Sequence, residues 1–189
     1  MRRMMAVGVV LVVSLAACSD DGDGAYLLVL GDSITVISSD EIKDKLSDYS
    51  TVIKADSGRK LADQFGAASA LAQPPPEIII VNLGINDVAK ENADLVDDMK
   101  QILQKFRRSC RVVVTVSSHL FQAEQRQLAN ELNDYIRRGN WVVADWDELI
   151  TEYKEDGEPD GSLTTDTIHP TELGKDRLAE LLDEAVADC

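Results

Sequence analysis

Residues 26–33 read Tyr-Leu-Leu-Val-Leu-Gly-Asp-Ser, an apolar run that ends abruptly in a small residue and two polar ones. A short, continuous apolar run is typical of a strand that is buried on both faces of a parallel sheet. The runs Ile78–Val81 and Val112–Val114 repeat the pattern further along the chain. In all we predict five strands, with the ranges Tyr26–Gly31, Thr51–Ala55, Glu77–Leu83, Arg111–Val116 and Trp141–Asp145.

Helical periodicity fills the segments between these strands. Apolar residues share one helical face within Asn92–Phe106, Leu128–Ile136 and Leu178–Val186. Asn92 and Thr171 have side chains suited to helix N-caps, and Pro74–Pro76 stops a helix ahead of the third strand. Strands that alternate with helices predict an α/β fold. We expect a single-domain, three-layer, doubly wound parallel sheet of five strands in flavodoxin-like order.

The first 17 residues have the pattern of a secretory signal peptide. Arg2 and Arg3 precede an apolar run over residues 6–15, which is too short to span a bilayer as a helix. Residues 15–18 (Leu-Ala-Ala-Cys) resemble the lipobox of bacterial lipoproteins, and this resemblance implies lipidation of Cys18. An ordinary signal peptide with an incidental cysteine is the alternative. Residues 18–24 would form a flexible tether to a domain over residues 25–189, and we expect an exported lipoprotein on the extracytoplasmic side of the cell membrane.

Composition and charge exclude several classes of function. The net charge is −15 at pH 7, whereas nucleic-acid binding needs clustered Lys and Arg. We therefore expect no nucleic-acid partner, and a membrane contact that runs through the lipid anchor rather than through broad adhesion to anionic lipid. The chain has two histidines, well separated and without a cysteine cluster beside either, and it has no glycine-rich phosphate loop. We expect neither a metal site nor a cofactor.

Two cysteines remain once Cys18 is assigned to the anchor. Cys110 lies just before the fourth predicted strand, and Cys189 ends the last predicted helix. Strand starts and helix ends meet at the same edge of a parallel α/β sheet, and an exported protein folds in an oxidising compartment. We therefore predict a disulfide between Cys110 and Cys189, with two free thiols as the alternative.

Distinctive polar residues follow three of the predicted strands, in the segments Gly31–Ser33, Asp56–Gly58 and Gly84–Asp87. Ligands of open parallel sheets bind at the carboxyl ends of the strands. The long irregular stretch before the last helix, residues 155–170, opens on the same edge and contains Asp166 and His169. An aspartate three residues before a histidine can orient the histidine ring. Ser33, His169 and Asp166 thus supply the nucleophile, base and carboxylate that acyl transfer through serine needs.

These segments closely resemble the four sequence blocks of the SGNH (GDSL-type) hydrolase family. The blocks are matched, in order, by Gly31–Ile34, Gly58, Gly84–Asp87 and Asp166–Pro170. The resemblance covers essentially the whole mature chain and implies an SGNH hydrolase fold. It also implies Ser33 as nucleophile, His169 as general base and Asp166 as the carboxylate that orients it. The oxyanion hole would consist of the backbone N–H groups of Ser33 and Gly58 and the side-chain amide of Asn86.

Each site residue also has a purely structural interpretation. Ser33 could be a helix N-cap that follows a strand, Gly58 a turn glycine, and Asn86 a cap of the next segment. Asp166 could be a surface loop residue. His119, which follows the fourth predicted strand, we interpret as part of a pocket wall or loop.

The expected function is a serine esterase that hydrolyses small acetyl-type or cell-envelope esters through an acyl-enzyme on Ser33. The same triad would also support O-acyl transfer to peptidoglycan or another envelope glycan, with a sugar hydroxyl replacing water. A catalytically silent binding module with the same fold is the third alternative. The complete set of five site residues counts against that module, because a silent domain has no need of all of them.

Overall fold

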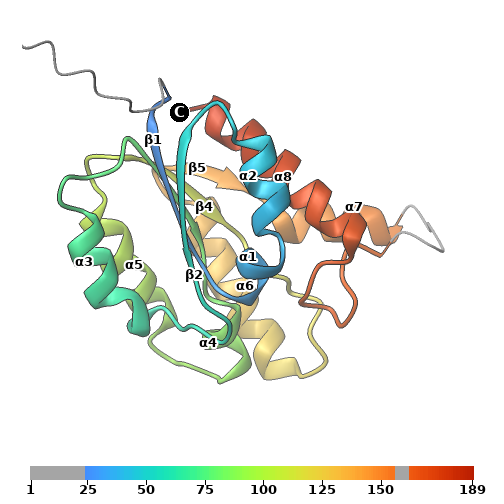
Figure 1. Cartoon of the computed structure of the whole chain (residues 1–189). Coiled ribbons are helices and arrows are strands. Elements are labelled where there is room, and N and C mark those ends of the chain that lie inside the picture. Colours follow the sequence, from blue (N-terminus) through green and yellow to red (C-terminus); the bar gives the residue numbers. More distant parts are fainter. Residues whose placement is uncertain (1–23, 156–161) are drawn as a thin grey trace, which may run out of the picture.

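The computed structural model describes residues 24–155 and 162–189, and five parallel strands within them form one sheet. The strands are β1 (Tyr26–Gly31), β2 (Ser50–Ala55), β3 (Ile78–Asn82), β4 (Cys110–Val114) and β5 (Val142–Ala144). Their order across the sheet, β2-β1-β3-β4-β5, confirms the predicted flavodoxin-like arrangement (Figure 1). The expected signal peptide, residues 1–17, and the tether up to residue 23 lie outside the described residues.

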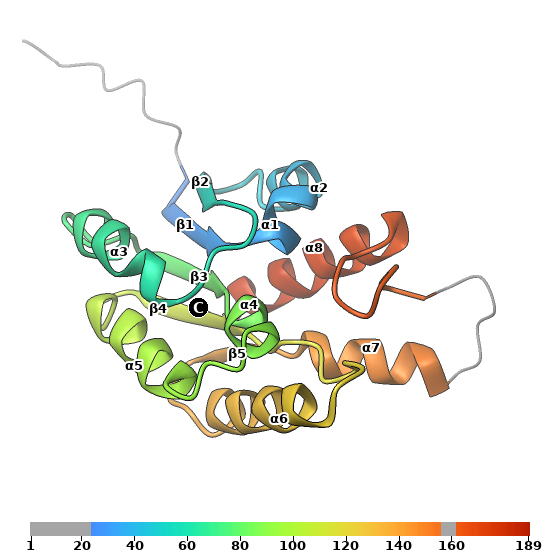
Figure 2. The same ribbon diagram turned by 90° about the horizontal axis from the view of Figure 1, so that it is seen from below.

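Helices cover both faces of the sheet and produce the three predicted layers. Figures 1 and 2 show α1, α2 and α8 over one face and α3, α5 and α6 over the other. The helices are α1 (Ser33–Ile37), α2 (Ser39–Lys45), the 3₁₀ helix η1 (Ala62–Gln64), α3 (Phe65–Leu71), α4 (Ile85–Ala89), α5 (Leu95–Lys105), α6 (Ala123–Arg137), α7 (Trp146–Glu155) and α8 (Glu172–Ala187). Within the described residues, no helix has the length and apolar character needed to cross a membrane.

The centre of the sheet is buried on both faces, as its apolar runs require. All residues of β3 are buried and so are Leu27–Gly31 of β1, whereas β2 at the sheet edge is partly exposed. Fully burying one such Leu, Ile or Val side chain contributes roughly 1.5–3 kcal/mol. The two central strands are therefore rigid, and the residues that follow their carboxyl ends start from fixed positions.

Most strand boundaries differ from the predicted ones by one or two residues. Strands β3 and β4 end before Leu83 and Val116, which the prediction had included. Both side chains are almost fully buried, at 1% and 4% exposure, although they lie beyond the last ladder positions. An apolar run in the sequence indicates that its residues are buried, not that they pair with a neighbouring strand. The run can therefore continue beyond the end of a strand when the turn that follows is also buried.

The two predicted helix caps have different outcomes. The Thr171 hydroxyl caps α8 by accepting the backbone N–H of Gly174 at 3.0 Å, as predicted. Asn92, in contrast, does not cap α5, which begins only at Leu95. The Asn92 amide instead donates to the carboxylates of Asp87 at 2.9 Å and Asp98 at 3.1 Å. The side chain of Asn92 is therefore engaged within the turn that precedes α5, where its Oδ1 also accepts the backbone N–H of Asp94 at 3.0 Å.

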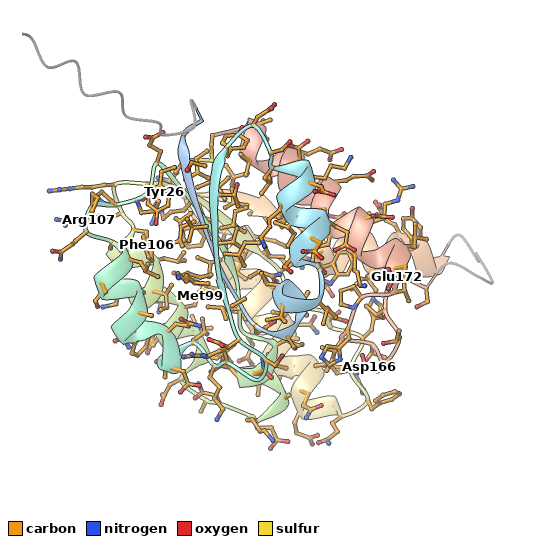
Figure 3. All side chains as sticks on the ribbon, viewed as in Figure 1. Tyr26, Met99, Phe106, Arg107, Asp166 and Glu172 are labelled. Carbon is orange, nitrogen blue, oxygen red and sulfur yellow. A yellow bond between two sulfur atoms is a disulfide. The ribbon has the colours of Figure 1, made fainter. Side chains whose placement is uncertain are left out.

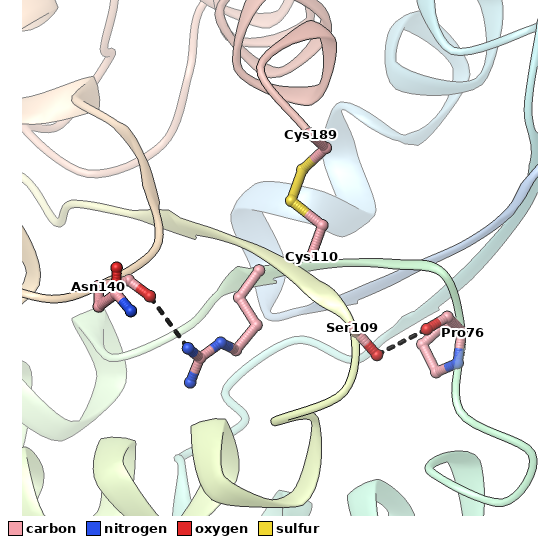
Figure 4. The surroundings of a disulfide bond; sticks show 6 residues. Pro76, Ser109, Cys110, Asn140 and Cys189 are labelled. Atoms are coloured by element: carbon pink, nitrogen blue, oxygen red, sulfur yellow. Dashed lines mark hydrogen bonds between the residues drawn. A yellow bond between two sulfur atoms is a disulfide. The ribbon is translucent and has the colours of Figure 1, made fainter.

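A disulfide joins Cys110 to Cys189, with the two Cα atoms 5.7 Å apart (Figure 4). It links the first residue of β4 to the residue at the end of the chain, just beyond α8. The backbone next to Cys110 is held by a further contact, because the Ser109 hydroxyl donates a hydrogen bond to the carbonyl of Pro76 at 2.6 Å. The bond therefore fastens the last helix to the amino-terminal edge of the sheet.

Replacing both Cys110 and Cys189 by serine should lower the free energy of unfolding by about 4 kcal/mol and the Tm by roughly 10 °C. The bond closes a loop over a sequence separation of 79 residues, so its loss frees much conformational entropy in the unfolded chain. Thermal unfolding of the oxidised wild type and the double variant measures the difference. Equal Tm values would show that the bond does not stabilise the domain.

Candidate active site

Ser33 lies directly beyond the end of β1, as the first residue of α1. The helix is capped by Asp32, whose carboxylate accepts the backbone N–H of Ile34 at 3.0 Å. The alternative interpretation of Ser33 as the N-cap is therefore wrong. Because Asp32 caps the helix, the Ser33 hydroxyl is left available for another partner.

That partner is His169, although 136 positions separate the two residues in sequence. The Ser33 Oγ and the His169 Nε2 are 3.1 Å apart, and the His169 Nδ1 lies 2.7 Å from the Asp166 Oδ2. With Nδ1–H donating to the carboxylate, Nε2 has a free lone pair to accept the serine proton. The structure thus brings the three predicted triad residues into one hydrogen-bonded series.

The Asp166 carboxylate also shapes the loop that carries the histidine. Its Oδ1 accepts the backbone N–H groups of Ile168 at 3.1 Å and His169 at 2.7 Å. The residue between the two, Thr167, has a φ of 72°, in the left-handed region. Burial raises the pKa of Asp166, but the backbone and ring donors of His169 and the N–H of Ile168 outweigh it and leave that pKa below its usual value. Asp166 therefore remains a carboxylate while it orients the ring.

Asn86 reaches the same edge from α4 and contacts the residue before the serine. Its Nδ2 donates to the Asp32 Oδ2 at 3.3 Å. Gly84, not Asn86, occupies the N-cap position of α4, so the capping interpretation of Asn86 is also wrong. A side-chain amide carries two N–H donors, and the bond to Asp32 uses only one of them. The other can serve an oxyanion.

Gly58 belongs to the turn that follows β2, on the same sheet edge. Ala55 at the end of β2 pairs with Gly31, and the N–H of Asp56 donates to the Gly31 carbonyl at 3.3 Å. Gly58 itself has a φ of 77°, a conformation that side chains disfavour. Its N–H has no hydrogen-bond partner among residues 24–155 and 162–189. The glycine thus presents an exposed, unpaired donor at the edge that carries Ser33.

Asp87 connects the Gly58 turn to the Asn86 segment. Its fully buried carboxylate accepts the backbone N–H of Leu61 at 2.9 Å and the amide of Asn92 at 2.9 Å. Burial, opposed in part by these donors, leaves the pKa of Asp87 raised. From the sequence, Asp87 was singled out only as part of the segment Gly84–Asp87. Its position between two loops makes it a positioning residue for the predicted oxyanion donors.

His119 is held by helix α7. Its Nε2 lies 2.9 Å from the hydroxyl of Thr151, and that hydroxyl donates to the carbonyl of Asp147 at 2.8 Å. The threonine oxygen therefore accepts the Nε2–H of His119. The next residue back, Ser118, donates its N–H to the Asp147 carboxylate at 2.6 Å. These contacts fit the interpretation of His119 as part of a loop wall.

Asp32 is the most strongly perturbed carboxyl group at this edge. It is 1% exposed, and burial raises its pKa from 3.8 to about 7, although the N–H of Ile34, the charge of His169 and the amide of Asn86 oppose the rise. The folded protein thus binds this proton more tightly than the unfolded chain does. The resulting stabilisation is fully present below about pH 4 and is lost as the pH rises through about 7.

The Asp32→Asn variant should not show this pH dependence. Between about pH 4 and 7 the wild type should lose up to roughly 4 kcal/mol of unfolding free energy relative to the variant. Urea unfolding of both proteins across this range measures the difference, because other titrating groups are common to the two. Parallel stability curves would contradict the raised pKa.

A serine, histidine and aspartate joined in this way, at the carboxyl edge of a flavodoxin-like sheet, define the SGNH class of hydrolase folds. The chain belongs to the GDSL-like lipase/acylhydrolase family, whose model matches residues 29–177. A comparison with curated proteins finds no match.

Solved structures with the same fold cover nearly the whole of this domain. An acetyl xylan esterase superposes with a TM-score of 0.69 at 17% identity, over 85% of this chain and 99% of its own. The carboxy-terminal catalytic domain of peptidoglycan O-acetyltransferase A from Streptococcus pneumoniae gives 0.66 at 18% identity, over 87% and 92%. A GDSL-like lipase from Bacteroides thetaiotaomicron gives 0.65 at 17% identity, over 86% and 87%. At these identities the likeness shows the fold alone.

Proposed function

We propose that this protein is a serine esterase that hydrolyses small acetyl-type or cell-envelope esters. The hydrogen-bonded series from Ser33 through His169 to Asp166 is the observation that supports it most directly. In the first step His169 takes the serine proton while Ser33 Oγ attacks the ester carbonyl. The imidazolium, stabilised by Asp166, then protonates the departing alcohol and leaves an acyl group on Ser33.

Water completes the cycle by the same chemistry in reverse. His169 removes a proton from water, the hydroxide attacks the acyl carbonyl, and the Ser33 oxygen leaves as it regains the proton. Each of the two tetrahedral intermediates carries a negative oxygen. The N–H groups of Ser33 and Gly58 and the second amide N–H of Asn86 are the donors we assign to that oxygen.

The exposure of the triad favours substrates with a large alcohol portion. The side chains of His169 and Asp166 are 40% and 54% exposed, so the alcohol side of the ester is not enclosed. Beside the Gly58 turn lies a hollow of about 320 Å³, lined by four polar residues (Lys54, Asp56, Arg59 and Gln64) and four apolar ones (Ile53, Ala55, Ala67 and Leu71). A mixed lining of this kind suits a sugar, which has hydroxyl groups and apolar C–H faces, better than a lipid chain.

The same open geometry supports O-acyl transfer to an envelope glycan as a second candidate function. A sugar hydroxyl can approach an exposed acyl-enzyme as readily as water does. Among proteins with this fold, the Streptococcus pneumoniae domain is described as the catalytic part of a peptidoglycan O-acetyltransferase. Hydrolysis and transfer would use the same nucleophile, base and oxyanion donors.

We also propose that the protein is exported and lipidated on Cys18. The support is the sequence of residues 1–18, together with the disulfide between Cys110 and Cys189, which suits an oxidising compartment. Mass spectrometry of the membrane fraction should show a diacylglyceryl group on an amino-terminal Cys18. An unmodified chain that begins elsewhere would refute this assignment.

Kinetics with acyl chains of different lengths test the esterase. We expect turnover of p-nitrophenyl acetate and a steep fall in kcat/KM with longer acyl chains. Addition of an acetylated muropeptide and an acceptor glycan then separates the two outcomes, because hydrolysis releases acetate whereas transfer yields an acetylated glycan. A folded protein that neither turns over esters nor reacts with a fluorophosphonate would instead be the silent binding module.

A further inference from the structure

We infer that a basic surface at the amino-terminal edge of the sheet docks on anionic phospholipid headgroups, and so turns the active site away from the membrane. This surface, the basic edge, consists of Lys105, Arg107 and Arg108. The three residues line a hollow of about 400 Å³ whose other walls are formed by residues 72–75. The inference goes beyond the esterase activity and rests on the proposed Cys18 anchor.

Charge is strongly segregated around the basic edge. The chain as a whole has a net charge of −15, yet residues 99–123 contain no acidic side chain and five basic ones: Lys100, Lys105, Arg107, Arg108 and Arg111. Lys100 pairs with Asp97, and Arg111 donates to the carbonyl of Asn140. Within the described part of the chain, the other three form no ion pair. Three unpaired cations thus surround one hollow in a very acidic protein.

The helix dipole accounts for the position of only one residue of the basic edge. Lys105 lies in the last turn of α5, where a cation offsets the partial negative charge of the helix end. Arg107 and Arg108 lie beyond the helix and are exposed. Exposed carboxylates at the same edge, among them Asp48, Glu77 and Asp188, do not contribute to the lining of the hollow. The ionisable side chains that line the hollow are therefore all basic, and they are available to an external anion.

The basic edge lies where the amino-terminal segment enters the domain. Cys110 donates its N–H to the carbonyl of Glu77, and Glu77 donates to the carbonyl of Tyr26, the first residue of β1. Figure 3 shows Arg107 and Tyr26 at one end of the molecule and Asp166 at the other. Docking of the basic edge on a surface would therefore leave the triad on the far side of the domain.

The tether holds this edge within reach of the membrane. Eight peptide steps from Cys18 to Tyr26 span at most about 28 Å. Surface charges act over a Debye length of about 8 Å in physiological salt, so the tether alone does not fix the orientation. An anionic leaflet repels the acidic remainder of the domain and attracts the basic edge. Each basic residue near such a surface raises docked occupancy about fivefold, so three raise it by roughly two orders of magnitude.

Fluorescence energy transfer from tryptophan to a dansyl lipid tests the inference. Trp141, which lies at this edge and contacts Arg111, serves as the donor nearest to the bilayer. The full chain, extracted from membranes, is reconstituted in neutral phosphatidylcholine vesicles and in vesicles containing about one third phosphatidylglycerol. We expect greater transfer in the anionic vesicles and a loss of that excess in about 0.5 M salt.

Two triple variants with the same net charge test whether the excess transfer depends on the basic edge. The triple variant Lys105→Gln, Arg107→Gln and Arg108→Gln should abolish the excess transfer. The control variant Lys43→Gln, Lys90→Gln and Arg177→Gln removes three exposed charges elsewhere and should retain it. Equal transfer in both lipids for the wild type, or equal loss in both variants, would overturn the inference. Unchanged Tm and p-nitrophenyl acetate turnover show that each variant is folded.

Separate measurements show whether the proposed esterase activity or the proposed lipidation of Cys18 is wrong. Ester turnover in detergent tests the esterase without any bilayer. Mass spectrometry of the reconstituted sample tests lipidation of Cys18. If Cys18 carries no lipid, sedimentation of the chain with the same two vesicle types tests the basic edge directly, and equal sedimentation with both overturns the inference.

Discussion

Replacing Ser33 by alanine is expected to lower kcat/KM for p-nitrophenyl acetate by roughly 10⁴- to 10⁶-fold. The substitution removes the hydroxyl oxygen that lies 3.1 Å from the His169 Nε2, so the proposed acyl-enzyme cannot form. The fold should survive, because the carboxylate of Asp32 caps α1 and the serine hydroxyl does not. Steady-state kinetics measure the loss, and thermal unfolding should give a nearly unchanged Tm.

Ser69→Ala provides the matched control. Ser69 is exposed on α3 and its hydroxyl donates only to the carbonyl of Phe65 one turn earlier, so activity should not change. Ester turnover that survives Ser33→Ala would remove Ser33 from the mechanism. A fluorophosphonate that labels the wild type but not Ser33→Ala would identify the reacting oxygen independently of turnover.

Replacing Asn86 by alanine should lower kcat by about 10²- to 10³-fold with little change in KM. One missing oxyanion donor costs on the order of 2.7–4 kcal/mol in the transition state, whereas the ground-state carbonyl carries little charge for that donor to bind. The buried Asp32 also loses a hydrogen bond when the amide is removed. A modest decrease in Tm should therefore accompany the kinetic effect.

Asn92→Ala separates the two contributions. Asn92 also donates its amide to a buried carboxylate, that of Asp87, but it lies outside the proposed oxyanion hole. This variant should lose stability while it keeps most of its kcat. If the two asparagine variants lose kcat equally, the role of Asn86 is structural. A rise in KM at constant kcat would likewise contradict stabilisation of the transition state.

The strands and their parallel arrangement were predictable because the burial of apolar side chains determines them. The run from Leu27 to Leu30 is apolar at every position, which is favourable only in a strand that is covered on both faces. Alternation with helical segments then leaves few possible topologies. The positions of Ser33 and His169 at one edge follow from the same reasoning, because Ser33 follows β1 and His169 precedes α8, and the topology fixes the direction of both elements.

The contacts that position the site were not predictable from local sequence. Asp32 and Asp87 read as ordinary polar residues after a strand, yet each is almost fully buried. Their partners, Asn86 and Leu61, lie 54 and 26 positions away. No short pattern shows whether a carboxylate will face solvent or a donor brought in by another loop. Asn92 was misassigned as a cap for a different reason, because α5 begins only at Leu95 and the Asn92 amide bonds carboxylates five and six positions away.

One consequence follows from where the base and its carboxylate are attached. Their hydrogen bond closes within four residues of a single loop, whereas the bond from His169 to Ser33 joins two distant parts of the chain. That loop rests on α8 at Gly174, where a Cβ atom would lie only 2.0 Å from the carbonyl oxygen of Leu163. The base and its carboxylate therefore belong to one segment of the chain and the nucleophile to another. The contact between Ser33 Oγ and His169 Nε2 joins the two segments, so a displacement of the loop on α8 would lengthen that contact while the bond between His169 and Asp166 stayed intact.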